Sequence, residues 1–225
     1  MLIRHLGLKH AGNQRESTLV LELQVQEGVL LMPKFSIITP TIIRPSLDRL
    51  CASIDKQSFK DYEHIIIVDI PFKEVTNEQK FRLEELVKHG HNRSISFCAT
   101  RHQNYGHTCR HNISKMALGE YILYVDDDDH FADNEVLLTL NNVKLDWAIF
   151  PILRYKSYYL ENPPGCKTGT GMFLHKRQLG TWPDRNDYEA DGHFVEELKQ
   201  KAPYEVFHCR PLIVMEINHE HINAI

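Results

Sequence analysis

Short apolar runs alternate with amphipathic segments between residue 35 and about residue 125. Runs that are apolar throughout are typical of strands buried on both faces of a parallel sheet. Four such strands are expected, at residues 35–39, 64–69, 95–99 and 120–125. Helical spacing and capping residues predict helices between them, at about residues 47–54, 76–88 and 108–118. This alternation of strand and helix predicts a doubly wound α/β sheet.

The pattern changes on either side of this region. After residue 145 the apolar runs are short and few helices separate them, with strands expected at residues 146–153, 155–160, 171–175 and 204–208. These runs predict a mixed or antiparallel, substrate-facing half built on the same sheet. Residues 1–31 hold one alternating run, at 18–26, that could form a strand. We treat residues 1–31 as an N-terminal extension that is mobile or dispensable.

Composition narrows the class of protein. The chain has 225 residues and a net charge of −4, so no overall basic field favours nucleic-acid binding. No apolar run approaches the roughly 18 residues of a membrane-spanning helix, and residues 1–31 lack the pattern of a cleavable signal. The five cysteines are scattered without a CxxC pair, which favours a reduced, cytoplasmic protein. The fourteen histidines fit no zinc-binding spacing.

Four consecutive aspartates, Asp126, Asp127, Asp128 and Asp129, follow the strand predicted at residues 120–125. Acids at the C-terminal end of a buried strand lie where open α/β sheets bind ligands. The four carboxylates repel one another by about 1 kcal/mol per pair even in water, and a divalent cation would relieve that repulsion. Oxygen ligands suit Mg²⁺ or Mn²⁺, which usually also hold substrate phosphates. The alternative is a solvated acidic turn.

Polar residues also follow the first two predicted strands. Thr39 and Thr41 flank the end of the first strand, and Asp69 ends the second. Strand ends at one edge of a parallel sheet converge on one crevice, where a carboxylate can accept a hydrogen bond from a nucleobase or a ribose hydroxyl. A local cap at the end of each strand is the alternative for every one of these positions.

The start of the third predicted helix is rich in groups that bind phosphate. Arg101 and Arg110 offer guanidinium forks, and Asn104 offers an amide. A helix start adds main-chain donors. The alternative is a solvated helix face, which we favour for His107 and His111.

A second acidic group lies late in the chain. Glu189 and Asp191 precede a predicted helix in which Phe194 and Leu198 should face the core. A carboxylate at that exposed helix start can act as a general base for a hydroxyl nucleophile. The alternative role is N-capping by Asp191.

These segments, in this order, resemble family 2 glycosyltransferases. Residues 35–41 resemble the opening strand of that family, and residues 64–69 resemble its second strand, which ends in an aspartate that contacts the nucleotide base. Residues 110–129 are similar to the family's long run ending in the DxD motif. The resemblance covers roughly residues 34–200. It implies a single GT-A-like α/β domain with a Rossmann-like mixed central sheet flanked by helices.

The resemblance also implies roles for particular residues. Asp126 and Asp128 fall on the two acids of the DxD motif, which hold a divalent metal and the donor nucleotide-sugar. Residues 189–191 fall where the family keeps its base, although Glu-Ala-Asp replaces the usual Glu-Asp and leaves two candidates. His219 or His221 is expected to supply a late metal ligand, of which we favour His219.

The expected protein is therefore an inverting glycosyltransferase of the hexosyltransferase type that requires Mn²⁺ or Mg²⁺. Its donor is a UDP-, GDP- or dTDP-linked sugar. Its acceptor is a glycan, a lipid-linked molecule or another hydroxyl compound. Peripheral association of the protein with a membrane is compatible with such an acceptor. Residues 32–225 form the domain, with a nucleotide-binding half at about 32–130 and an acceptor half at about 131–225. The alternatives are a nucleotidyltransferase and a non-catalytic sugar-binding domain.

Overall fold

A computed structural model describes residues 32–154, 156–165 and 167–215. The described residues from Pro33 onward belong to one compact unit. The strand expected at residues 18–26 and the candidate ligand His219 lie outside the described residues. None of the described helices combines the length and the apolar character needed to cross a membrane.

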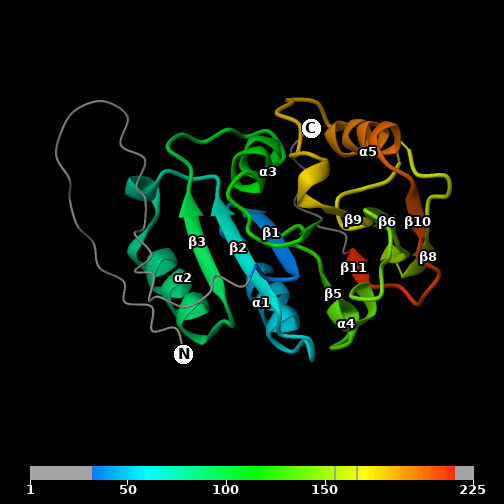
Figure 1. Cartoon of the computed structure of the whole chain (residues 1–225). Coiled ribbons are helices and arrows are strands. Elements are labelled where there is room, and N and C mark those ends of the chain that lie inside the picture. Colours follow the sequence, from blue (N-terminus) through cyan, green and yellow to red (C-terminus); the bar gives the residue numbers. More distant parts are fainter. Residues whose placement is uncertain (1–31, 155, 166, 216–225) are drawn as a thin grey trace. The chain divides into compact units, whose positions relative to one another are not determined.

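The chain alternates strand and helix in its first half, as predicted, and then becomes richer in strands (Figure 1). The helices are α1 (Leu47–Asp55), α2 (Asn77–His89), α3 (His107–Ser114), α4 (Val136–Leu140) and α5 (Ala190–Lys201), with short 3-10 turns η1 (Phe72–Glu74) and η2 (Arg177–Leu179). The strands are β1 (Phe35–Thr41), β2 (Tyr62–Val68), β3 (Arg93–Phe97), β4 (Tyr121–Tyr124), β5 (His130–Phe131), β6 (Trp147–Ile149), β7 (Ile152–Arg154), β8 (Ser157–Tyr159), β9 (Phe173–Lys176), β10 (Tyr204–Val206) and β11 (Ile213–Met215).

Seven strands form a mixed central sheet in the order β10-β6-β9-β4-β1-β2-β3. β1 pairs in parallel with β2 and β4, and β2 pairs in parallel with β3. β9 is antiparallel to both β4 and β6. A second sheet has the order β5-β11-β7-β8. The expected parallel half and mixed half are both confirmed, but the second half also builds a sheet of its own.

The run predicted as one strand over residues 146–153 is split between the two sheets. β6 lies in the central sheet and β7 in the smaller one, with Phe150 and Pro151 between them. Pro151 has no main-chain N–H to give to a sheet ladder, so the chain leaves the central sheet at this point. The carbonyl of Pro151 instead accepts a hydrogen bond from the N–H of Leu212 (2.9 Å).

Helices cover both faces of the central sheet (Figure 1). Leu123 and Val125 point into the apolar cluster shared with α1 and α4. Ile122 and Tyr124 point into the opposite cluster, shared with α3 and α5. Burying each large apolar side chain contributes about 1.5–3 kcal/mol. Packing on both faces therefore holds β4 in place, and the residues that follow this strand lie at the C-terminal edge of the sheet.

Helix α3 ends at Ser114 rather than near residue 118 as expected. The chain must approach β1 closely before β4 begins. A Cβ atom on Gly119 would lie 2.4 Å from the main-chain nitrogen of Ser36, so only glycine fits there. This close approach places the start of β4 beside β1, with Tyr121 paired to Phe35.

Candidate active site

The four aspartates lie at the C-terminal edge of the central sheet, directly after β4. Val125 N–H donates to the carbonyl of Ile38 in β1 (3.1 Å), which places the acids beside the end of that strand. Asp127 and Asp129 are buried. Asp126 and Asp128 are partly exposed, with side-chain exposures of 31% and 17%, so these two carboxylates are open to a ligand.

Three of the acids converge. Oxygen atoms of Asp126, Asp128 and Asp129 all lie within 4.8 Å of one another. The structure thus brings together Asp126 and Asp128, the two acids predicted as metal ligands. Asp129 was not among the predicted metal ligands, although its place in the aspartate run was visible in the sequence.

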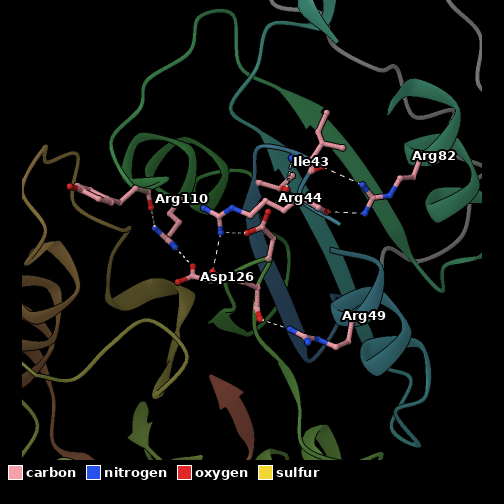
Figure 2. A network of polar contacts seen from close by, with 10 residues as sticks. Ile43, Arg44, Arg49, Arg82, Arg110 and Asp126 are labelled. Atoms are coloured by element: carbon pink, nitrogen blue, oxygen red, sulfur yellow. Dashed lines mark hydrogen bonds and ion pairs between the residues drawn. The ribbon is translucent and has the colours of Figure 1, made fainter. Parts of the chain in front are cut away.

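Arginine side chains contact the acids from two directions (Figure 2). Arg110 of α3 donates from Nη2 to Asp126 Oδ1. Arg44, in the loop after β1, donates from Nη1 to Asp127 Oδ1 (2.9 Å) and to Asp128 Oδ2 (3.0 Å). The mutual repulsion of the carboxylates is therefore relieved in part by fixed guanidinium groups, and metal binding is not the only way to balance their charge.

Arg49 of α1 adds a further cation to this edge. Its Nη2 donates to the main-chain carbonyl of Asp128 (2.7 Å). Sequence reasoning missed both Arg44 and Arg49. The available signal was two arginines, one in the loop before the first helix and one in its first turn, next to a strand end that was expected to face the site.

Asp127 links the acidic run to the end of β1. Thr41 Oγ1 donates to Asp127 Oδ2 (2.5 Å). Burial raises the pKa of Asp127 to about 6, while Arg44 and the Thr41 hydrogen bond act in the opposite direction. This acid therefore supports the local structure, and Asp126 and Asp128 are better placed to meet a ligand.

Thr39 is fully buried beside His64. Arg93 Nε donates to His64 Nδ1 (2.9 Å), so the ring proton lies on Nε2, which donates to Thr39 Oγ1 (3.1 Å). Burial holds the pKa of His64 well below its usual range, which keeps the ring neutral. In this structure the Thr39 hydroxyl thus belongs to an internal network.

The carboxylate of Asp69 holds the loop that leads to α3. Its two oxygens accept hydrogen bonds from the main-chain N–H groups of His102 (2.8 Å) and Gln103 (3.0 Å). Asn104 is buried and donates from Nδ2 to Thr108 Oγ1 (2.7 Å). Arg101 is exposed. The predicted nucleotide-binding residues of this region therefore lie on one loop, anchored by Asp69 at the end of β2.

The segment before α5 packs against α3 and brings the late acids to the site. Trp182 Nε1 donates to His107 Nδ1 (3.2 Å), and the two rings stack. His111 Nδ1 lies 2.6 Å from the Trp182 carbonyl oxygen. The expectation that His107 and His111 form a solvated helix face is wrong, because residues from the acceptor half cover α3. Burial also lowers the pKa of His107 to about 4.

Asp191 and Glu189 occupy different environments. Glu189 is exposed and stands at the N-cap of α5, without a side-chain capping bond. Asp191 lies in the first turn, where Oδ1 accepts from the N–H of Gly192 (2.8 Å). Burial raises the pKa of Asp191, while the hydrogen bond from Gly192 and the charge of Arg110 lower it. As predicted, Phe194 is buried in the core below this turn.

Comparisons with known proteins give a fold without a family. No protein-family model matches the chain, and no curated protein matches its sequence. Solved structures match its fold. One is S. aureus TarS 1–349 in complex with UDP-GlcNAc, with a TM-score of 0.67 and 18% identity, over 85% of this chain and 61% of that one. Another is the mannosyltransferase PcManGT from Pyrobaculum calidifontis, in complex with GDP-Man and Mn²⁺. It has a TM-score of 0.65 and 12% identity, over 89% of this chain and 62% of that one.

The chain spans only part of these proteins. It covers 60% of the chain in a second structure of TarS 1–349 and 38% of the chain in a third TarS structure. At such low identity the likeness establishes a shared fold. The predicted GT-A-like α/β fold, with a mixed central sheet flanked by helices, is confirmed by the strand order and by these likenesses.

Proposed function

We propose that this chain is a glycosyltransferase that moves a sugar from a nucleotide-sugar donor to a hydroxyl acceptor. The observation that carries the proposal is the convergence of Asp126, Asp128 and Asp129 at the C-terminal edge of the central sheet, with Arg110 bonded to Asp126. Proteins of the same fold have been solved with UDP-GlcNAc, UDP, or GDP-Man and Mn²⁺. Resemblance to family 2 enzymes favours an inverting reaction of the hexosyltransferase type.

The acidic site suits a divalent cation. Mg²⁺ binds oxygen ligands at about 2.1 Å, so opposite ligands in an octahedron lie about 4.2 Å apart. The oxygens of Asp126, Asp128 and Asp129, within 4.8 Å of one another, fit that geometry after small adjustments. When bound, Mn²⁺ or Mg²⁺ would neutralise the diphosphate leaving group. His219 remains a proposed further ligand.

Arg110 is the best-placed residue for the donor diphosphate. One arm of its guanidinium binds Asp126 and the other donates to the Tyr105 carbonyl (2.8 Å). Its carbon Cζ lies 4.9 Å from the centre of the Trp182 ring. A guanidinium held on three sides is already oriented, so little side-chain entropy is lost when it binds phosphate oxygens.

The remaining nucleotide contacts are assigned to the loops that follow β1 to β4. Thr41 and Asp127 lie at the β1 end, and Asp69 holds the loop with Arg101 and Asn104. Thr39 would support this edge of the sheet through its contact with His64. These loops would bind a nucleotide of the UDP, GDP or dTDP class, and their contacts with its base would select among the three.

Asp191 is our candidate for the general base. Its raised pKa moves it toward the working pH, which strengthens its ability to take the proton of an acceptor hydroxyl. The hydroxyl oxygen would attack the anomeric carbon as the bond to the diphosphate breaks, which inverts the configuration. Glu189 is exposed and less suited to the role.

The two alternatives have less support. A nucleotidyltransferase would need a glycine-rich loop after β1 to cradle a triphosphate, whereas residues 40–46 contain no glycine and Arg44 is bonded to the acids. A non-catalytic sugar-binding domain would have no need for the converging carboxylates of Asp126 and Asp128 or for a partly buried Asp191.

A donor screen tests this proposal. The full chain is incubated with UDP-, GDP- and dTDP-linked sugars and hydroxyl acceptors, with Mn²⁺, Mg²⁺ or EDTA, and nucleoside diphosphate release is measured. We expect release from one donor class and loss of release in EDTA. Pyrophosphate release from a nucleoside triphosphate would favour the nucleotidyltransferase. Release of neither product, with no nucleotide binding by calorimetry, would favour the sugar-binding domain.

A further inference from the structure

The loop between β1 and α1 has a conformation that its sequence does not favour. Ile43 has a φ of 67°, in the left-handed region that a β-branched residue rarely adopts. Its main-chain N–H donates to Thr41 Oγ1 (2.8 Å). Its side chain is buried in the same apolar cluster as Leu83 of α2. Backbone of this kind persists only where surrounding contacts fix it.

Arg82 of α2 supplies several of those contacts. Its Nη1 donates to the carbonyl of Ile43 (3.2 Å), and its Nη2 donates to the carbonyls of Arg44 (2.8 Å) and Pro45 (3.2 Å). Its Nε donates to the Asp48 carboxylate of α1 (3.0 Å). A single planar guanidinium thus binds three consecutive carbonyls, which a lysine ammonium cannot do in the same geometry.

The same loop contacts the acidic site with its side chains. Arg44 Nη1 lies between Asp127 and Asp128, and Thr41 donates to Asp127. Figure 2 shows Arg82 on one side of Ile43 and Arg44, with Asp126 on the other side. The five residues from 41 to 45 therefore connect the surface of α2 to the carboxylates.

We propose that Arg82 is a positioning residue that acts through Arg44. By holding three carbonyls of the loop, it fixes the guanidinium of Arg44, which bonds both Asp127 and Asp128. Arg44 in turn holds the Asp128 carboxylate in the position offered to a divalent cation. Within the described residues, the hydrogen bonds of Arg82 go to the loop and to Asp48, and none goes to the aspartates at 126–129. The metal-binding part of this inference rests on the proposed function.

Hydrogen exchange tests the structural part without any metal. In Arg82→Ala the amide of Ile43 should exchange about tenfold faster or more than in the wild type, and the segment 125–131 should also exchange faster. Arg82→Lys should behave like Arg82→Ala, because the planar guanidinium, and not its positive charge alone, holds the three carbonyls of the loop. The matched control is Arg210→Ala, which removes a similar two-armed pair with Asp133 (2.5 and 2.7 Å). Unchanged exchange in Arg82→Ala, or recovery in Arg82→Lys, would overturn the proposal.

Mn²⁺ affinity of the full chain, measured by calorimetry, tests the consequence for the site. Arg82→Ala should weaken Mn²⁺ binding about tenfold, whereas Arg210→Ala should leave it nearly unchanged. Once Arg44→Ala is present, adding Arg82→Ala should have almost no further effect. Additive effects would overturn the route through Arg44. Failure of the wild type to bind Mn²⁺ would instead contradict the proposed metal site, and hydrogen exchange would still decide the role of Arg82.

Discussion

The carboxylate of Asp69, at the end of β2, accepts a hydrogen bond from the main-chain N–H of His102 (2.8 Å). The resemblance implied that Asp69 contacts a nucleotide base. In the structure its carboxylate anchors the loop that carries Arg101 and Asn104. One acid at a strand end thus connects the sheet to the residues that would surround the donor.

Removal of Asp69 should therefore affect both stability and binding. Asp69→Ala leaves the N–H groups of His102 and Gln103 without their acceptor, and the free energy of unfolding should fall by about 2–4 kcal/mol. Urea unfolding and nucleotide calorimetry measure the two effects. The control is Asp146→Ala, because Asp146 pairs with Lys176 at the opposite edge of the sheet. Equal behaviour of the two variants would contradict the anchoring role.

His175 should make the fold sensitive to acid. Burial lowers its pKa from 6.5 to about 4, so the unfolded chain binds a proton between these values while the folded chain does not. This contribution to stability is complete above pH 6.5 and is lost as the pH falls toward 4. At pH 5 the loss is about 2 kcal/mol.

The substitution His175→Phe tests this contribution. It keeps an aromatic ring beside Tyr124 and Phe194 but cannot bind a proton. Urea unfolding at pH 7 and pH 5 should show a smaller loss of stability in the variant than in the wild type. The exposed His89 gives a control, since His89→Gln should keep the wild-type dependence. An unchanged pH dependence in His175→Phe would refute the prediction.

Substitution of Asp191 should separate chemistry from donor binding. Asp191→Asn keeps the side-chain shape and should leave donor affinity nearly unchanged. Turnover should fall by about 100-fold or more, because the base is lost. Steady-state kinetics with the donor found by the screen measure both. Glu189→Gln should retain most of its turnover, and the reverse result would move the role of base to Glu189.

The fold was largely predictable because strong local patterns and tertiary packing agree. The continuous apolar runs of β1, β2 and β4 can be buried only in a sheet covered on both faces. The capping residues that predicted a helix at about 76–88 form a capping box between Thr76 and Gln79 at the start of α2. The split at Pro151 was harder to predict, because an apolar run does not show which of two sheets will take each part of it.

The site was predictable only where it follows directly from strand ends. Asp126, Asp127 and Asp128 come straight after β4, so their location follows from the sheet. Arg44 reaches them across more than eighty residues of sequence, through a loop whose left-handed Ile43 has no local sequence signal. The burial of α3 under Trp182 likewise depends on a tertiary contact that helical periodicity cannot show.

The central claim is that the acids after β4 hold a cation against the donor diphosphate. Calorimetry of UDP, GDP and dTDP binding, with Mn²⁺ and with EDTA, tests it most directly in the wild type and in Asp128→Ala, with Asp146→Ala as the control. We predict Mn²⁺-dependent binding of one nucleotide that is lost in Asp128→Ala and kept in Asp146→Ala. Equal nucleotide affinity in the wild type and in Asp128→Ala, with Mn²⁺ present, would contradict the claim.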